Sequence, residues 1–200
     1  SRSIVERGDA WYLHAGDRVY FNKPPLAFWL TAACQWAFGG DAWAVRLSGW
    51  LCACGCVVAT AALVRRLHGA RAGLAAGVVM ATTSELIRVS TQFRLDVPHL
   101  LFVLLAALGV VTAAKRELAG RRGAALAGPM LLSGVAIGLA LMTKPFFGPL
   151  AYLFMAPWLL WVGARRTLLW IAASLAVGVA VAAPWHVSMV MHYGRPFVDE

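Results

Sequence analysis

The sequence predicts an all-α, polytopic membrane protein with about six transmembrane helices and one short interfacial helix. Of the 200 residues, 60% are hydrophobic and only 14% are charged, which leaves too little polar surface for a soluble domain. Apolar stretches near the ~20 residues that cross a bilayer recur along the chain. The basic residues collect in short segments between those stretches, so the net charge of +9 indicates membrane topology and not nucleic-acid binding.

The elements follow from the apolar stretches and the polar segments between them. We expect an external loop over 1–24, an interfacial helix over 26–38, spans over about 42–64, 72–91, 97–114, 124–142, 146–162 and 167–183, and a second external loop over 184–200. The 26–38 stretch covers roughly 20 Å as a helix, short of a ~30 Å hydrocarbon core. Pro24 and Pro25 suit its start. Both ends of the chain look like interior segments, so we expect a fragment of a longer protein.

The basic connectors predict the orientation. Alternation of the spans places nine of the 18 Lys and Arg on one side. These are Arg65, Arg66, Arg71, Lys115, Arg116, Arg121, Arg122, Arg165 and Arg166. The only acid among them is Glu117, and the positive-inside rule makes this side cytoplasmic. The external side then gathers both external loops, the turn around Asp96 and the break at Lys144, so we expect function at the outer interface and not at mid-membrane.

Two residues of the external side are the first candidates for chemistry. Lys23, in "VYFNKPPLAFWL", can bind a phosphate as a compact point charge, or it can be a membrane-edge lysine that snorkels to headgroups. Asp96 can bind a cation or a sugar hydroxyl or act as a base, or it can cap the helix that follows. Both alternatives stay open for each residue.

Further charged residues carry the same kind of alternative. Lys144 is either a phosphate partner or a snorkelling cap. Glu85 and Arg88 share a helix face at a spacing of three, which favours an internal salt bridge. Trp185 is expected in the outer aromatic belt. The segments "GARAGLAAG" and "GVAIG" are small-xxx-small patterns that allow close helix packing. The four cysteines lie in apolar segments and are interpreted as packing residues, not metal ligands.

Several stretches together resemble a known family. "GDAWYLHAGDRVYFNKPPLAFWL", "RLDVPHLLF", "LMTKPFFG" and "APWHVSMVMHYGRPFVDE" are similar, in order, to motifs of bacterial GT-C glycosyltransferases that use polyprenyl-phosphate sugars. This family includes the lipid A aminoarabinose transferase and the dolichyl-phosphate-mannose–protein mannosyltransferase-like enzymes. The first stretch is fairly specific, and the others are weaker singly. The resemblance implies a GT-C-like transmembrane domain and transfer of a sugar (hexosyl or pentosyl) from a lipid phosphate.

The resemblance also implies roles for particular residues and partners. Lys23 would neutralise the carrier phosphate as it leaves, with Tyr20, Arg94 and Lys144 as further substrate-binding candidates. Asp96 would lie in the cavity as a catalytic candidate. The donor would be a polyprenyl-phosphate sugar and the acceptor lipid A, another glycan or a protein, at the periplasmic face of a bacterial inner membrane.

Two departures from the family pattern qualify these roles. Asn22 stands where the family usually has an acid that is associated with a metal, so no metal ligand is assigned, although a divalent metal stays possible. The family's main catalytic carboxylate would fall upstream of Ser1, so the piece itself is expected to be inactive. Two other functions remain open: a lipid transporter or flippase, which needs charges deep in the membrane, and a non-catalytic membrane scaffold.

Overall fold

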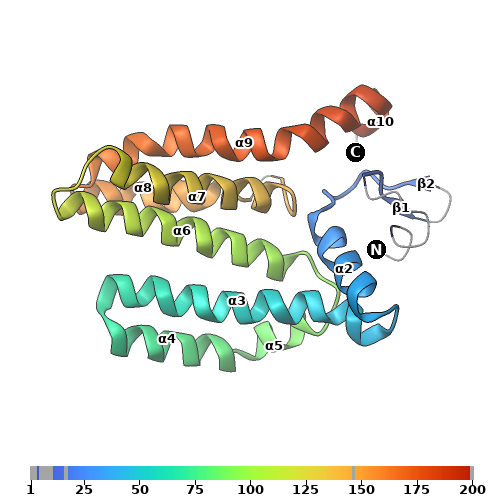
Figure 1. Cartoon of the computed structure of the whole chain (residues 1–200), viewed down its shortest axis with the longest axis horizontal. Helices are drawn as coiled ribbons and strands as arrows, with labels where there is room; N and C mark the ends of the chain where they lie inside the picture. The colour runs from blue at the N-terminus through green and yellow to red at the C-terminus, as the bar shows by residue number, and fades with distance from the viewer. Residues whose placement is uncertain (1–3, 5–10, 16–17, 146, 199–200) are drawn as a thin grey trace.

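The computed structural model describes residues 4, 11–15, 18–145 and 147–198. A small antiparallel hairpin, β1 (His14–Ala15) and β2 (Arg18–Val19), comes first. The helices that follow are α2 (Leu26–Phe38), α3 (Ala42–His68), α4 (Ala70–Thr82), α5 (Ser84–Ser90), α6 (Asp96–Leu118), α7 (Ala124–Leu141), α8 (Leu150–Trp161), α9 (Arg165–Tyr193) and α10 (Arg195–Val198). The long helices lie side by side, and α2 and the hairpin sit at one end of them (Figure 1).

The fold class predicted from the sequence is confirmed. Four helices, α3, α6, α7 and α9, are long and apolar enough to cross a membrane, and the bent pair α4 and α5 makes up to five. The interfacial helix predicted over 26–38 has the bounds of α2. Helices account for all the described secondary structure except the two-residue strands of the hairpin.

Two of the six predicted spans differ from the expectation. The segment over 72–91 bends by 55° between α4 and α5. The hydroxyls of Thr82 and Thr83 donate to the carbonyls of Val78 and Val79 at 2.9 Å and 2.8 Å, a back-bonding that bends helices. The segment over 146–162 contains only the 12-residue α8. At 1.5 Å per residue that helix covers about 18 Å, too short to span a bilayer.

The prediction of an external loop over 184–200 is wrong, because most of this segment is helical. Helix α9 continues through Pro184 to Tyr193, and α10 follows. Proline removes one helical hydrogen bond, yet the helix persists because its last turns are packed. Trp185 is 2% exposed and Met189 is fully buried, both in a cluster with Leu26 and Met142.

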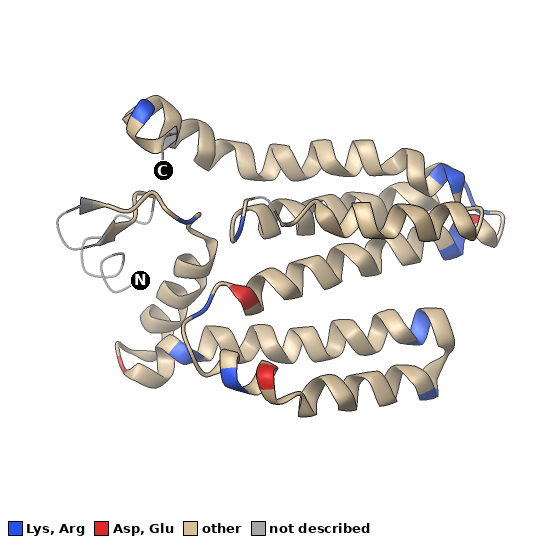
Figure 2. Cartoon of the chain, turned by 180° about the vertical axis from the view of Figure 1, so that it is seen from behind, with Lys and Arg blue, Asp and Glu red and all other residues tan. Residues whose placement is uncertain are grey.

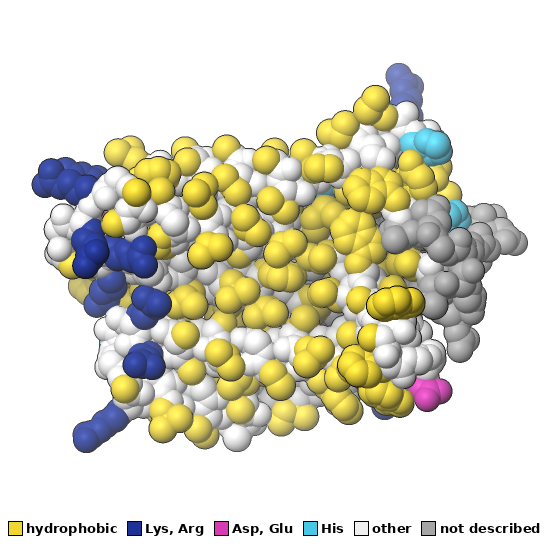
Figure 3. Space-filling view, in the orientation of Figure 1, with side chains coloured by type: hydrophobic (Ala, Val, Ile, Leu, Met, Phe, Trp, Pro, Cys, Tyr) yellow, Lys and Arg dark blue, Asp and Glu magenta, His cyan; other side chains and the backbone are white. Residues whose placement is uncertain are grey.

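Charge separates along the bundle as the sequence predicts. Figure 2 shows Lys and Arg collected where α3 and α6 end and where α7 and α9 begin, and Figure 3 shows the same cations at one end of an apolar surface. We call this the basic end. The end that carries α2, the start of α6 and the last turns of α9 is called the outer end. The assignment of the basic end to the cytoplasm stays a prediction from the positive-inside rule.

Small residues bring the helices close, as the two small-xxx-small patterns predict. A Cβ on Gly138 of α7 would lie 2.8 Å from the carbonyl oxygen of Gly178 on α9. A Cβ on Gly73 of α4 would lie 2.7 Å from the carbonyl oxygen of Ala61 on α3. Both helix pairs therefore touch at their backbones, which only glycine permits at these positions.

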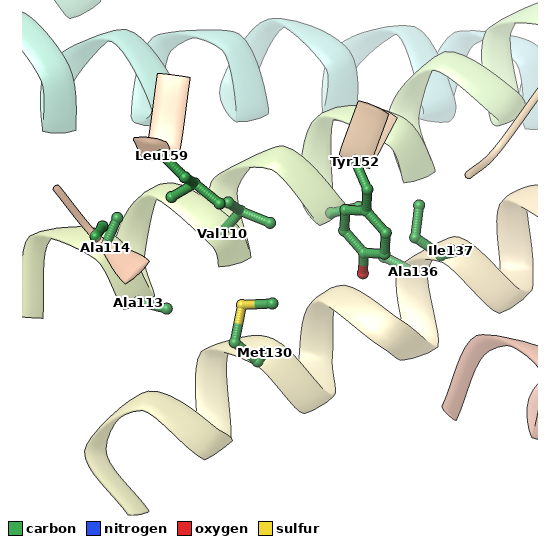
Figure 4. Packing of buried hydrophobic residues seen from close by; sticks show 10 residues of the cluster. Val110, Ala113, Ala114, Met130, Ala136, Ile137, Tyr152 and Leu159 are labelled. Carbon is green, nitrogen blue, oxygen red and sulfur yellow. The ribbon is translucent and has the colours of Figure 1, made fainter. Parts of the chain in front are cut away.

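The main core lies between α6, α7 and α8, where Val110, Met130 and Leu159 are fully buried (Figure 4). A polar chain crosses this core. The Tyr152 hydroxyl lies 2.9 Å from Ser133 Oγ and 2.5 Å from Ser174 Oγ. The two serines also donate to backbone carbonyls of α6 and α7. The network ties four helices together, and each of its three hydroxyls makes at least one hydrogen bond.

Candidate functional site

The candidate site at the outer end begins with a contact between two distant segments. The backbone N–H of Leu26, the first residue of α2, donates to the carbonyl of Met142, which ends α7 (3.1 Å). Leu26 and Met142 also belong to one buried cluster. The loop that carries Lys23 and the break that carries Lys144 are therefore held next to each other, although about 120 residues separate them in sequence.

Lys144 and Asp96 form an ion pair between the α7 break and the start of α6. Of the two alternatives for Asp96, the structure does not support the cap: Leu95 is the N-cap residue of α6, and no side-chain cap hydrogen bond forms there. The Lys144 side chain is 30% exposed and that of Asp96 is 50% exposed. The Lys144 ammonium also lies 5.9 Å from the centre of the Phe147 ring. The pair is open to a ligand at the outer end, and such an exposed pair contributes little to stability.

His99 joins this site, and the sequence analysis missed it. It lies one turn after Asp96, and its Nδ1 is 2.9 Å from Thr143 Oγ1 and 3.2 Å from the Ala140 carbonyl. Thr143 Oγ1 donates its own proton to that same carbonyl at 2.7 Å. Nδ1 must therefore carry a proton, because only a donor fits between these two oxygens. The i, i+3 spacing from Asp96 was the available signal in the sequence.

Lys23 lies in the turn that enters α2. Its side chain is half-buried, and it forms no hydrogen bond or ion pair within the described part of the chain. Pro24 and Pro25, both buried, fix the backbone between Lys23 and α2. The ammonium is therefore available to an anion at the outer end. Its role as a phosphate ligand stays a prediction.

Tyr20 and Arg94 lie at the same end, each with a local contact. The Tyr20 N–H donates to the Leu13 carbonyl at 2.7 Å, and its ring meets Phe28 edge-on at 5.9 Å. Arg94 Nε donates to Gln92 Oε1 at 2.9 Å. Tyr20 thus helps to dock the hairpin on α2, and Arg94 leaves most of its guanidinium N–H groups unused. Their substrate-binding roles stay predictions.

The described residues around Asn22 do not fit a metal site. Its side chain is exposed and neutral. The described residues contain no group of three or more His, Cys, Asp or Glu placed to hold an ion. No step proposed below uses a metal.

Aromatic contacts fasten the first loop to α9. Trp185 Nε1 donates to the Trp11 carbonyl at 3.0 Å, and Trp11 Nε1 donates to Ser188 Oγ at 2.7 Å. The Tyr12 ring stacks on His192 at 4.9 Å. Trp185 lies at the outer end as predicted, but its side chain is buried in the cluster with Leu26 and Met142 and is not part of an exposed aromatic belt. The loop, α2, the α7 break and α9 thus form one packed outer end.

Glu85 and Arg88 form the predicted ion pair, with Nη2 to Oε1 at 2.5 Å and Nε to Oε2 at 2.8 Å, but the prediction that it is internal is wrong, because the two side chains are 64% and 54% exposed. The pair is exposed on α5, towards the outer end. This pair lies towards one end of the bundle and its charges match each other, so it does not supply the charges deep in the membrane that a transporter would need.

These features define a class: a polytopic membrane protein with a cationic site at one end of its helix bundle. A family model described as dolichyl-phosphate-mannose-protein mannosyltransferase matches residues 22–188. The chain belongs to this family.

Curated relatives are undecaprenyl phosphate-alpha-4-amino-4-deoxy-L-arabinose arabinosyl transferases. The one from Erwinia tasmaniensis is 29% identical over 192 residues, and the one from Pseudomonas paraeruginosa is 31% identical over 188 residues. These matches cover 94% and 92% of this chain but 34% of each relative. The chain therefore spans about a third of the length of the relatives.

Two solved structures share the fold. ArnT from Cupriavidus metallidurans matches in the apo state at a TM-score of 0.83 and 22% identity, over 98% of this chain and 37% of that one. The same protein bound to undecaprenyl phosphate matches at 0.83 and 23% identity, over 98% and 36%. The GT-C-like architecture predicted from the sequence is thus confirmed for this part of the fold.

Proposed function

We propose that the chain is part of a membrane glycosyltransferase that moves a sugar from a polyprenyl-phosphate carrier to an acceptor at the periplasmic face of a bacterial inner membrane. One observation carries the proposal: the Leu26–Met142 hydrogen bond joins the Lys23 loop to the Lys144–Asp96 pair at the outer end. The names of the relatives, which specify a sugar on undecaprenyl phosphate, support the class of donor.

Charge development in this reaction suits the two lysines. The bond between the sugar C1 and the phosphate oxygen breaks, and a new bond forms from C1 to the acceptor hydroxyl oxygen. The departing polyprenyl phosphate gains negative charge, which a preorganised ammonium stabilises most in a site with little water. Lys23 takes this role, because its ammonium forms no ion pair with a carboxylate of the described chain and is therefore available to the phosphate.

A phosphate can replace Asp96 as the ion-pair partner of Lys144. Its ammonium is paired with Asp96 but partly exposed. A dianionic or monoanionic phosphate at the outer end competes for the same three N–H donors. Asp96 then positions Lys144 between turnovers. An ion-paired carboxylate is a poor base, since protonation would break the pair, so the proton of the acceptor hydroxyl goes to a carboxylate elsewhere in the whole protein.

The test uses the full-length protein in membranes with a polyprenyl-phosphate sugar donor. Lys23→Ala is expected to abolish sugar transfer while expression persists, and Asp96→Ala, which leaves Lys144 without its positioning partner, is expected to lower it. Lys115→Ala, at the basic end, is the matched control and is expected to transfer at the rate of the unchanged protein. Unchanged turnover in both outer-end variants would contradict these roles.

The transporter alternative has its own readout. Lipid movement by the reconstituted protein without sugar transfer would replace the glycosyltransferase proposal with a flippase. A protein that does neither, and whose outer-end variants behave like the unchanged chain, would favour a membrane scaffold.

A further inference from the structure

An apolar groove runs between α6 and α7 towards the basic end. Its volume is about 580 Å³. It is lined by Arg66 of α3, by Phe102, Leu105, Leu108, Gly109, Thr112 and Arg116 of α6, and by Gly128, Pro129, Leu132, Val135, Ala136 and Leu139 of α7. From Phe102 to Arg116 the groove follows α6 for about 21 Å at 1.5 Å per residue. The groove is therefore long and narrow, and it lies within the part of the helices that crosses the membrane.

Exposed apolar side chains form the open side of the groove. Leu132 is 72% exposed, and Leu105 and Val135 are each 39% exposed. A Cβ added at Gly128 would meet no atom within 4 Å, so the groove is open beside this residue. A hydrocarbon chain of the surrounding bilayer can enter such a groove without crossing a polar barrier.

Two guanidinium groups stand at the basic end of the groove. Arg116 Nη1 donates to the Ala125 carbonyl at 2.8 Å, which leaves its other N–H groups free. Arg66 is exposed and forms no hydrogen bond or ion pair with another described residue. Glu117 is the acid of this end in the described chain, and its oxygens accept from the Arg166 and Thr167 amides instead. The two cations are thus left without a counter-charge from the residues that the structure describes.

We propose that this groove binds an anionic phospholipid of the leaflet at the basic end. The phosphate lies between Arg66 and Arg116, whose planar donors suit phosphate oxygens, and one acyl chain lies along the groove. A purely apolar occupant, such as another helix of the whole protein, would leave the two charges unmatched at its end. The charged end of this groove is separate from the outer-end site, because the two lie at opposite ends of α6. The other end of the groove, at Phe102 and Leu139, reaches the buried cluster of Leu26 and Met142.

The test is native mass spectrometry of the purified full-length protein in detergent, titrated with phosphatidylglycerol and, separately, with zwitterionic phosphatidylcholine. Arg66→Ala/Arg116→Ala is expected to weaken phosphatidylglycerol binding at least fivefold. Arg71→Ala/Arg121→Ala removes the same charge from the same end outside the groove, and is expected to bind like the unchanged protein. Equal losses in both double variants would overturn the proposal, because general charge would then explain binding.

A second variant separates the groove from its charged end. Leu132→Trp places a bulky side chain at the exposed wall and keeps both arginines, and it is expected to lower phosphatidylglycerol binding at least threefold. Unchanged binding in this variant, or equal affinity for phosphatidylcholine, would contradict the site. So would a disulfide formed readily between a cysteine placed at position 135 and one on another helix of the whole protein, because that helix would then fill the groove.

Discussion

The Leu26 amide and the Met142 carbonyl satisfy each other across a 3.1 Å hydrogen bond. Each group is otherwise orphaned. Leu26 is the first residue of α2, so its N–H has no partner within the helix, and Met142 is the C-cap of α7. Because Pro24 and Pro25 fix the entry into α2, this bond sets where the Lys23 loop meets the Lys144 break.

This bond predicts slow hydrogen exchange at a position where exchange is normally fast. The Leu26 amide is expected to exchange more slowly than the amide of Ala42, the first residue of α3, which is exposed. Residue-resolved exchange of the purified protein checks this. Equal rates at the two helix starts would show that the contact between the loop and the break does not persist in solution.

His99 is predicted to support the α7 break with modest energy. His99→Leu removes the donor to Thr143, but the Ala140 carbonyl keeps the bond from Thr143 Oγ1. Thr143 Oγ1 loses a donor but still donates to the Ala140 carbonyl, so each buried oxygen keeps one hydrogen bond and the loss is expected to be about 0.5–1.5 kcal/mol of unfolding free energy. Denaturant unfolding in detergent measures it. His99→Gln, which restores a donor, is expected to recover part of the loss, and a larger cost for Gln than for Leu would contradict the hydrogen-bond assignment.

The sequence could predict those parts of the fold that depend on the length and hydropathy of each apolar stretch. The 13-residue apolar stretch after Pro25 became α2 with the expected bounds. Hydropathy could not place the bend at Thr83, because the hydroxyl bonds that form it are a local backbone effect. Nor could it show that α9 passes Pro184, since burial of Trp185 against distant segments holds those turns.

The sequence could predict at which end of the bundle the candidate site lies, but not which of its residues contact one another. The alternation of charge between the two sides of the spans predicted Lys23, Asp96 and Lys144 at one end. The structure has them there, through the Leu26–Met142 hydrogen bond and the Lys144–Asp96 ion pair. The pairing of Lys144 with Asp96 depends on how α6 and α7 pack, which no local pattern encodes. His99 was missed for the same reason: its partner Thr143 is 44 residues away.

Glu117 is predicted to stabilise the start of α9. Ala164 precedes that helix and cannot cap it. Glu117, on α6, takes the place of a capping side chain for α9. Its Oε1 accepts from the Arg166 N–H at 2.9 Å, and its Oε2 accepts from the Thr167 N–H at 2.7 Å. Glu117→Ala is therefore expected to cost about 0.5–2 kcal/mol, as for the loss of an N-cap. Thermal unfolding of the purified protein measures this change.

Two controls separate capping from general charge. Glu117→Gln keeps one acceptor oxygen and loses the charge that favours a helix N-terminus, so its cost is expected to lie between that of the unchanged protein and Glu117→Ala. Asp41→Ala removes an acid from the N-cap position of α3, where no side-chain cap bond forms. It is expected to change stability less than Glu117→Ala, and the reverse order would rule out the capping role.

The contact between α7 and α9 gives the sharpest stability prediction, because α7 also contains a second glycine, Gly128, that can serve as the control. A Cβ at Gly138 would lie 2.5 Å from Val181 Cβ and 2.8 Å from the Gly178 carbonyl oxygen, so Gly138→Ala must push the two helices apart. Its cost is expected to be about 1–3 kcal/mol, as for other overpacked sites. Gly128→Ala, in the same helix, meets nothing within 4 Å and is expected to be neutral or to stabilise by about 0.5–1 kcal/mol. Denaturant unfolding of both variants in one detergent compares them directly, and equal stability would mean that α7 and α9 do not touch at their backbones.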